Sequence, residues 1–175
     1  AEQRGDHRMA LTHFLHGAQL AKDPGLAEMG ARAALALDDP AALERASDLW
    51  LELAPRSMGA HQFAAYARLE GDDIDGATMY LRRLIALAVE EGDDGYMQAA
   101  RLVSKLQPPE RRLQLMQTLT ADEPENADAW FARALVAVGA ERNEEAVDAA
   151  RRAADLRPDW NEPRIFLVQV LVSMG

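Results

Sequence analysis

Cysteine is missing from this sequence of 175 residues. Its absence excludes disulfide bonds, thiolate zinc sites and a cysteine nucleophile. Basic residues are in the minority, because 19 Lys and Arg stand against 29 Asp and Glu and give a net charge of −10. Binding to phosphate backbones or anionic lipid surfaces needs clustered Lys and Arg, so nucleic acids and membrane surfaces are disfavoured as partners. The apolar run from Leu84 to Val89 is far shorter than the ~20 residues of a membrane-spanning helix.

Catalytic motifs are missing as well. No serine lies in a Gly-x-Ser-x-Gly elbow, and the sequence has no His-Glu-x-x-His zinc motif and no glycine-rich phosphate loop after a strand. We therefore expect a protein that is not an enzyme and that uses no cofactor and no metal ion. Hydrophobic residues make up 49% of the chain, which is enough for a packed core and excludes disorder as the main state.

Glycine and proline fall in clusters that separate ten segments of helical length. These segments are rich in Ala, Leu, Arg, Glu and Met, which are strong helix formers, and they contain few β-branched residues. The sequence therefore predicts an all-α chain. Helices are expected at residues 6–21, 24–37, 40–53, 58–70, 74–89, 94–106, 110–121, 127–138, 143–156 and 162–174.

Small residues recur in alternate helices with a period of about 34. Ala65 − Ala31 gives 34, Ala99 − Ala65 gives 34, and Ala134 − Ala99 gives 35. A period of this length built from two helices is typical of the tetratricopeptide repeat. Small side chains are needed where helices cross closely, so these alanines are predicted to lie at helix crossings.

The segment 126–158 resembles the tetratricopeptide consensus through Trp130, Ala134, Ala146, Ala153 and Pro158. The resemblance implies a right-handed α-solenoid of helix pairs, with repeats starting near residues 24, 58, 92, 127 and 161 and one helix of a truncated repeat before them. The position of Trp130 is occupied in the other repeats by Ala27, His61, Gly95 and Arg164.

In that family the first helix of each pair lines a concave groove that binds protein partners. By position, the resemblance assigns to this groove the residues that we call the groove set: Glu28, Met29, Arg32, Gln62, Phe63, Tyr66, Tyr96, Met97, Phe131, Leu135, Ile165, Phe166 and Gln169. Its aromatic and Met side chains suit recognition of a helix or an extended peptide. Packing against neighbouring helices of the array needs the same apolar surface, so both interpretations stay open. The Lys and Asn of the family's carboxylate clamp are absent from these positions.

Details outside the consensus resemble a narrower group, the outer-membrane tetratricopeptide lipoproteins that partner a carboxyl-terminal-processing protease in pseudomonads. The details are Gln3-Arg4-Gly5, Ala10-Leu11, the Lys22-Asp23-Pro24-Gly25 turn with Leu26-Ala27-Glu28 after it, and Glu91-Gly92-Asp93. The resemblance implies a periplasmic adapter that brings the protease and cell-wall hydrolase substrates together, held at the outer membrane by an anchor outside this segment.

The two ends indicate a fragment of a longer array, because the chain begins with Ala1 and ends in an apolar helix over residues 161–174. We expect that last helix to self-associate through Phe166 and Val170, since it lacks a covering partner. Two classes of function fit such a fragment. The favoured one is a non-enzymatic interaction scaffold, and the alternative is a substrate-positioning segment of an enzyme whose catalytic domain lies outside it.

An acidic cluster precedes Gly76. Asp72, Asp73 and Asp75 have the carboxylate density of a calcium loop, but the loop spacing would put Gly71 at its first position and Arg82 at its closing position. We interpret the cluster, and likewise residues 90–94, as a turn between helices. In this interpretation Gly71 adopts the left-handed conformation and the aspartates cap the next helix.

Two histidines, His13 and His16, lie three residues apart on one expected helix. They could share a metal ion with Asp6 or His7, which makes a metal- or ligand-binding helical bundle a third hypothesis. No reliable further ligand is evident in the sequence, so we favour solvent-facing or packing roles for both histidines.

Overall fold

A computed structural model describes residues 2–175 of the chain, with side chains from His7 onward. The Gln3-Arg4-Gly5 motif and the Asp6 carboxylate therefore lie outside the described side chains. Within residues 2–175 the regular secondary structure consists of α-helices joined by turns, which confirms the all-α fold expected from the sequence. The helices are α1 (Glu2–Ala21), α2 (Pro24–Ala36), α3 (Pro40–Leu53), α4 (Met58–Glu70), α5 (Ile74–Glu90), α6 (Gly95–Val103), α7 (Pro109–Asp122), α8 (Ala127–Gly139), α9 (Asn143–Leu156) and α10 (Glu162–Ser173).

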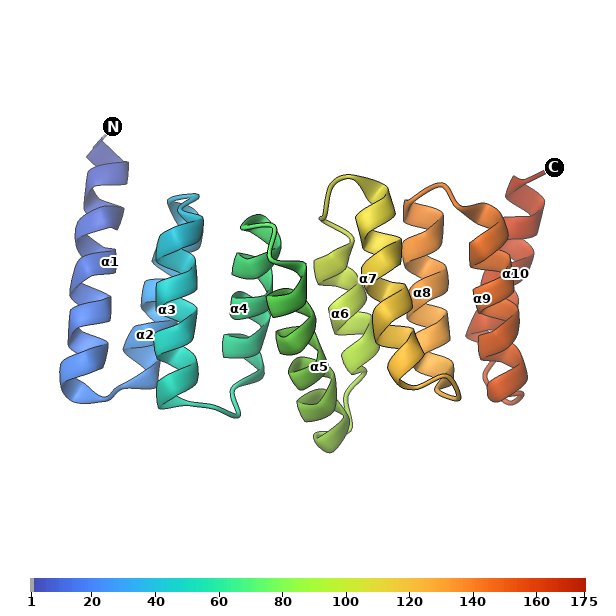
Figure 1. The fold of residues 1–175 in the computed structure, drawn as a ribbon, viewed down its shortest axis with the longest axis horizontal. Coiled ribbons are helices and arrows are strands. Elements are labelled where there is room, and N and C mark those ends of the chain that lie inside the picture. The colour runs from blue at the N-terminus through green and yellow to red at the C-terminus, as the bar shows by residue number, and fades with distance from the viewer. Residues whose placement is uncertain (1) are drawn as a thin grey trace. The chain divides into compact units, whose positions relative to one another are not determined.

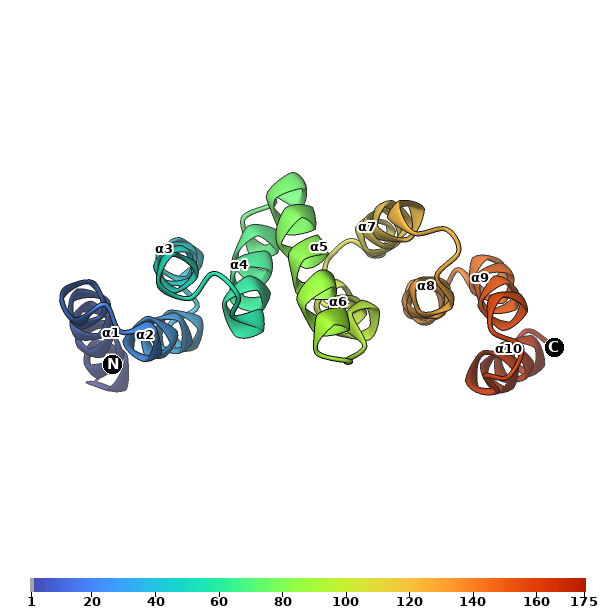
Figure 2. The ribbon, with the colours of Figure 1, turned by 90° about the horizontal axis from the view of Figure 1, so that it is seen from below.

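The chain divides into two compact units, residues 1–87 and 88–175. In the first unit α1 packs on α2, α2 on α3, and α3 on α4, with neighbours antiparallel (Figure 1). In the second unit α8 packs on α6, α7 and α9, and α9 packs on α10 (Figure 2). In the first unit α1 to α4 thus pack mainly on the helices next to them in the chain, whereas in the second unit α8 also packs on α6, two helices earlier.

Helix starts follow the sequence closely because capping residues and prolines mark them. Asp23 precedes α2 and its carboxylate accepts a hydrogen bond from the Gly25 N–H at 2.8 Å. Asp39 precedes α3 and accepts from the Ala42 N–H at 2.9 Å. Both helices then begin with proline, whose missing N–H costs nothing in the first turn.

The acidic turn between α4 and α5 caps the helix that follows it, as expected. The Asp73 carboxylate accepts from the Gly76 N–H at 2.9 Å. The expectation for Gly71 is wrong, because Gly71 has φ −82° and Asp72 takes the left-handed conformation with φ 64°. Aspartate tolerates that region better than most residues, and Asp38 and Glu141 hold it at two other helix ends with φ 55° and 58°.

Helix α6 is shorter than the sequence predicts: it ends at Val103 instead of residue 106. The hydroxyl of Ser104 donates to the carbonyl four residues earlier at 2.7 Å. The guanidinium of Arg112 donates to the Leu106 carbonyl at 2.6 Å, so this carbonyl is satisfied by a side chain outside the helix. Pro108 disfavours helical conformation in the residue before it.

The alanines that define the period lie in the core. Ala31, Ala65, Ala99 and Ala134 are each 0% exposed, which confirms that the periodic positions are buried. Ala134 packs with two alanines of α9 under partly buried apolar side chains of α8 and α10. Small side chains at buried positions allow helices to approach each other closely.

One contact recurs in three repeats at the position of the consensus tryptophan. The Trp130 indole Nε1 donates to a proline carbonyl at 2.8 Å, the His61 ring Nε2 to another at 3.0 Å, and the Arg164 guanidinium to a third. The acceptors are the carbonyls of Pro124, Pro55 and Pro158, each six residues before its donor. Since a carbonyl only accepts, Nε2 of His61 carries a proton. The contact fixes each proline-containing turn to the helix after it.

Candidate protein-binding surface

The first unit carries six members of the groove set, on α2 and α4. Glu28 and Arg32 form an exposed ion pair at 2.7 Å along α2, and the neighbouring Met29 side chain is 43% exposed. On α4, Phe63 is half-buried and its ring centroid lies 5.8 Å from that of Trp50. Gln62 beside it is exposed. This part of the set therefore combines accessible apolar surface with polar side chains.

Tyr66 lies where α4 meets the end of α2. Its half-buried ring lines a small cleft together with Leu35 and Pro40. Partial burial raises the pKa of Tyr66, and the nearby Glu70 carboxylate raises it further, so the hydroxyl stays protonated and can donate a hydrogen bond. Leu35 is 43% exposed and lies outside the groove set. In the tetratricopeptide family the twelfth position of a repeat also faces the groove. Leu35 is the twelfth residue of the repeat that starts at Pro24, so the sequence did carry a signal for it.

The second unit carries the other seven members, and they differ widely in exposure. Tyr96 is 3% exposed and Phe131 is 9% exposed, so these two rings contribute little accessible surface. The members that are half-buried or exposed are Met97, Leu135, Ile165, Phe166 and Gln169. Tyr96 and Phe131 are therefore packed inside the array, as the second interpretation of the groove set expects. Partner binding by the groove set stays a prediction.

Burial also governs the chemistry of Tyr96. It raises the pKa of the phenol to about 12, and the carboxylate of Glu123 adds to the effect. Removing a proton from a buried hydroxyl next to negative charge is costly, so Tyr96 stays neutral. The residue is a neutral core side chain, and no acid–base role follows from it.

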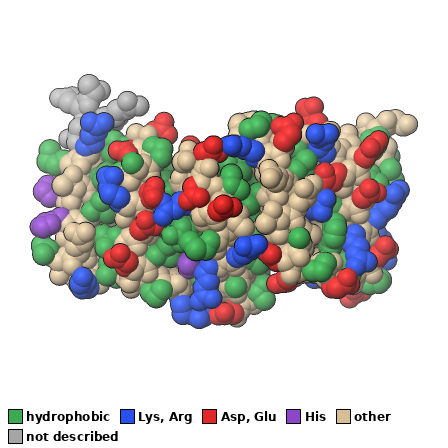
Figure 3. Space-filling model, in the orientation of Figure 1, with side chains coloured by type: hydrophobic (Ala, Val, Ile, Leu, Met, Phe, Trp, Pro, Cys, Tyr) green, Lys and Arg blue, Asp and Glu red, His purple; other side chains and the backbone are tan. Residues whose placement is uncertain are grey.

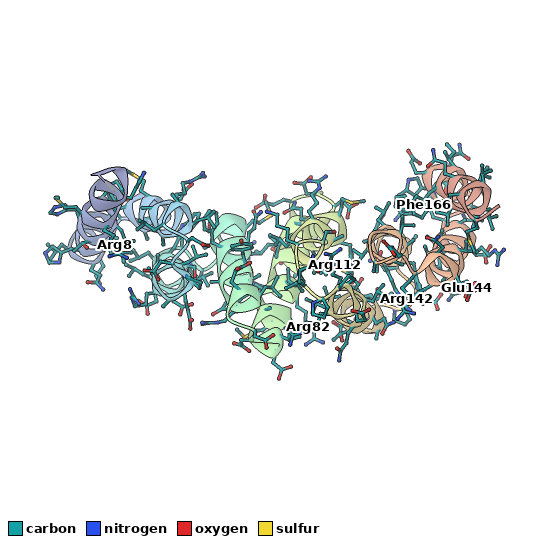
Figure 4. All side chains as sticks on the ribbon, turned by 90° about the horizontal axis from the view of Figure 1, so that it is seen from above. Arg8, Arg82, Arg112, Arg142, Glu144 and Phe166 are labelled. Atoms are coloured by element: carbon teal, nitrogen blue, oxygen red, sulfur yellow. The ribbon has the colours of Figure 1, made fainter. Side chains whose placement is uncertain are left out.

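Phe131 is the centre of an aromatic cluster in the second unit. Its ring centroid lies 4.9 Å from that of Trp160 and 5.6 Å from that of Phe166, both in edge-to-face geometry. Phe166 lies on the side of α10 that faces α8 (Figure 4). The Arg157 guanidinium stacks 4.6 Å from the Trp160 ring and forms a two-bond pair with Asp128 at 2.6 and 2.9 Å. Trp160 lies in the turn between α9 and α10, outside the helices from which groove positions were counted.

An ion pair joins α8 to α9 in the same unit. Arg133 and Glu145 form a pair at 2.6 Å, and the Arg133 guanidinium lies 5.1 Å from the centre of the Trp130 ring. Partial burial pushes the pKa of Glu145 upward, but hydrogen bonds from Gln117 and Arg133 outweigh it, so the pKa lies below its usual value. Across the face in Figure 3, acidic and basic side chains are intermixed with hydrophobic ones. That face carries no broad field of one sign.

His13 and His16 are both exposed on α1. Among the described residues, no three His, Asp or Glu side chains are arranged as ligands for a metal ion. Within the same part of the chain, every helix is too short or too polar to cross a bilayer.

Comparison with solved structures identifies the fold. A crystal structure of the MamA protein has 16% sequence identity and a TM-score of 0.52, covering 90% of this chain and 86% of its own. A crystal structure of YrrB, described as a TPR protein with an unusual peptide-binding site, has 15% identity and a TM-score of 0.50, covering 96% of this chain and 84% of its own. This chain has the tetratricopeptide repeat fold. No family model matches the sequence, and no curated protein is significantly similar to it.

The last helix, α10, leaves apolar side chains exposed, but they are not the two that the sequence led us to expect. Val170 is 5% exposed and Phe166 packs against Phe131, so both face inward. The expectation that these two residues drive self-association is therefore corrected. The exposed apolar side chains of this region are Ile165, Val168, Leu171, Val172 and Met174, between 43% and 76% exposed.

We expect self-association through this exposed face of α10. Replacing Val168 and Val172 together by Gln removes branched side chains that are 60% and 76% exposed, and should weaken dimerisation in sedimentation by roughly tenfold. The matched control is the pair Met9→Gln and Leu20→Gln on α1, also well exposed. A parent chain that sediments as a strict monomer at high concentration would rule out the expectation.

Proposed function

We propose that this chain is a non-enzymatic scaffold that binds protein partners through the first helices of its repeats. The observation that carries the proposal is the accessible apolar surface of the first unit. Met29 and Leu35 are each 43% exposed on α2, and Phe63 and Tyr66 are half-buried on α4. We call these four residues the unit-one groove. Flat aromatic side chains give a large contact area to a peptide, and flexible Met side chains adapt their packing to it. The unusual peptide-binding site ascribed to YrrB, which shares the fold, supports this use of it.

We propose further that the partners are cell-envelope proteins. The sequence resemblance to outer-membrane tetratricopeptide lipoproteins supports an adapter that brings a carboxyl-terminal-processing protease and cell-wall hydrolases together in the periplasm. The net charge of −10 gives no general attraction to acidic or neutral partners, so for these we expect apolar anchors and individual polar contacts to supply the binding. The binding determinants are therefore expected among exposed apolar residues.

Replacing Tyr66 by Ala should weaken partner binding by roughly 30-fold, because truncating an anchor in an interface typically costs about 2 kcal/mol or more. The measurement is capture of a purified carboxyl-terminal-processing protease, and of cell-wall hydrolases, by the immobilised chain. Met29→Ala should act in the same direction. Circular dichroism must show unchanged helix content, since Tyr66 is only half-buried.

The matched control is Met79→Ala on α5, whose side chain is 55% exposed outside the groove set. It should bind like the parent chain. If Met79→Ala weakens capture as much as Met29→Ala, the interface lies elsewhere. If the parent chain retains neither class of protein, the adapter proposal fails.

A further inference from the structure

A second surface of the first unit has a different chemistry from the unit-one groove. Six residues from α3, α4, α5 and the turn between α3 and α4 line a pocket of about 500 Å³ that opens to solvent. They are Asp48, Leu51, Glu52, Pro55, His61 and Tyr80, and we call the site the His61 pocket. Its volume falls in the range of small-ligand sites. It shares no residue with the groove set.

His61 is the most buried polar group of this pocket. Its side chain is 7% exposed, and Nε2 donates to the Pro55 carbonyl at 3.0 Å. Nδ1 is therefore an acceptor, and no described residue donates a hydrogen bond to it. Burial lowers the pKa of His61, and the positive charge of Arg83 lowers it further, so the ring is neutral near pH 7. Nδ1 is itself enclosed and has almost no surface open to solvent, so the pocket presents the ring of His61 to a ligand and not this acceptor.

The repeat explains why a pocket forms at this place. His61 occupies the position at which Trp130 makes the same bond to its own proline. The imidazole reproduces the bond to the carbonyl but fills much less volume than an indole. The Tyr80 ring lies beside it, with centroids 6.1 Å apart, and forms another wall.

The charged groups of the lining are the carboxylates of Asp48 and Glu52. Partial burial raises the pKa of Asp48, and the neighbouring Glu52 carboxylate raises it further, which shows that the two negative charges repel each other. Asp48 accepts weak bonds from Arg68, at 3.2 and 3.3 Å, and from the Tyr80 hydroxyl at 3.4 Å. A cation seated in the pocket would relieve the repulsion.

The arginine beside the pocket does not cancel this negative charge. Arg68 forms ion pairs with Glu44, Asp48 and Asp73. Its guanidinium also lies 5.7 Å from the centre of the Tyr80 ring. One positive charge is thus shared among three carboxylates, so Asp48 receives only part of its attraction. Arg83 adds a positive charge that acts on His61 from outside the lining, and within the lining the charges are those of Asp48 and Glu52.

We propose that the His61 pocket binds the ammonium group of a lysine side chain of a partner protein. An ammonium group has three hydrogen-bond donors and no acceptor, which complements a lining whose charged groups are two carboxylates. Leu51, Pro55 and the Tyr80 ring supply apolar walls for the four-carbon stem. A guanidinium fits less well, since only Glu52 could accept its two parallel bonds, while Asp48 already accepts two from Arg68. The proposal rests on the proposed function only in taking the partner to be a protein.

The test is a titration of the isotope-labelled chain at neutral pH, followed through the ring resonances of His61 and Tyr80. The probe is a capped five-residue peptide with one central lysine and glycine or alanine elsewhere. It should shift both sets of resonances in a saturable way, while the same peptide with acetyl-lysine should shift neither. Glu52→Gln should weaken binding about fivefold or more, because it removes an exposed charge of the lining. The matched control Asp75→Asn removes an exposed charge of α5 outside the lining and should change the affinity less than twofold.

Each other outcome overturns the proposal. Equal shifts with the acetyl-lysine peptide would mean that the pocket accepts any alkyl chain. Equal affinity for an arginine peptide would remove the preference for ammonium. Binding of n-butylammonium without binding of the lysine peptide would make the site one for small amines. Tyr66→Ala must leave the lysine titration unchanged, so a failure of the unit-one groove is distinguishable from a failure of the pocket.

Discussion

Replacing Phe131 by Ala is expected to lower the free energy of unfolding by about 3–5 kcal/mol. The ring is 9% exposed and makes edge-to-face contacts with Trp160 and Phe166, which would face a cavity in the variant. If α10 moves toward α8 and fills part of the cavity, the loss of unfolding free energy should lie at the lower end of this range. The measurement is urea unfolding followed by circular dichroism, compared with the parent chain.

The control for this prediction is Ile165→Ala, which truncates another member of the groove set. Ile165 is 57% exposed, so its loss should change stability by less than about 0.5 kcal/mol. The pair separates the two interpretations of the groove set that the sequence left open. If Phe131→Ala unfolds like the parent but loses partner binding, Phe131 belongs to an interface and the cluster is not a core.

Helix positions were the part of this fold that could be predicted from sequence, because local signals mark them. Asp23 and Asp39 cap helices that start with proline, and the helices at 40–53, 58–70 and 143–156 have the expected bounds. The bounds failed at α6, where the Leu106 carbonyl accepts a hydrogen bond from the Arg112 side chain of α7. A bond between residues of different elements leaves no trace in local composition.

The groove set was harder to predict, because a period gives the side of a helix on which a residue lies and not what covers it. Tyr96 and Met29 occupy groove positions of different repeats, yet Tyr96 is 3% exposed and Met29 is 43% exposed. Trp160 packs on the ring of Phe131. It lies in the turn between α9 and α10, and groove positions were counted on helices only. A signal for turn packing was nevertheless present, since His61, Trp130 and Arg164 each follow a proline by six residues. That spacing marks the recurring bond to the proline carbonyl.

Replacing Ala134 by Leu is expected to lower the free energy of unfolding by about 1–3 kcal/mol, because three extra carbons must enter a filled space. Ala134 is 0% exposed and packs with Ala149 and Ala150 of α9. For a chain of this length, each kcal/mol lowers the melting temperature by roughly 2–4 °C, so the change is measurable by thermal unfolding. Ala65→Leu and Ala99→Leu should act in the same direction, since both positions are also 0% exposed.

The matched control is Ala121→Leu, near the end of α7, where the same enlargement points into solvent. It should leave the melting temperature within about 1–2 °C of the parent, because surface substitutions change stability by ~0.5 kcal/mol at most. A destabilisation confined to Ala134, Ala99 and Ala65 follows only if close helix crossings recur with the period read from the sequence. Neutral results at all three positions would mean that the helices are spaced widely enough to admit Leu. In that case the alanine period would reflect helix propensity and not packing.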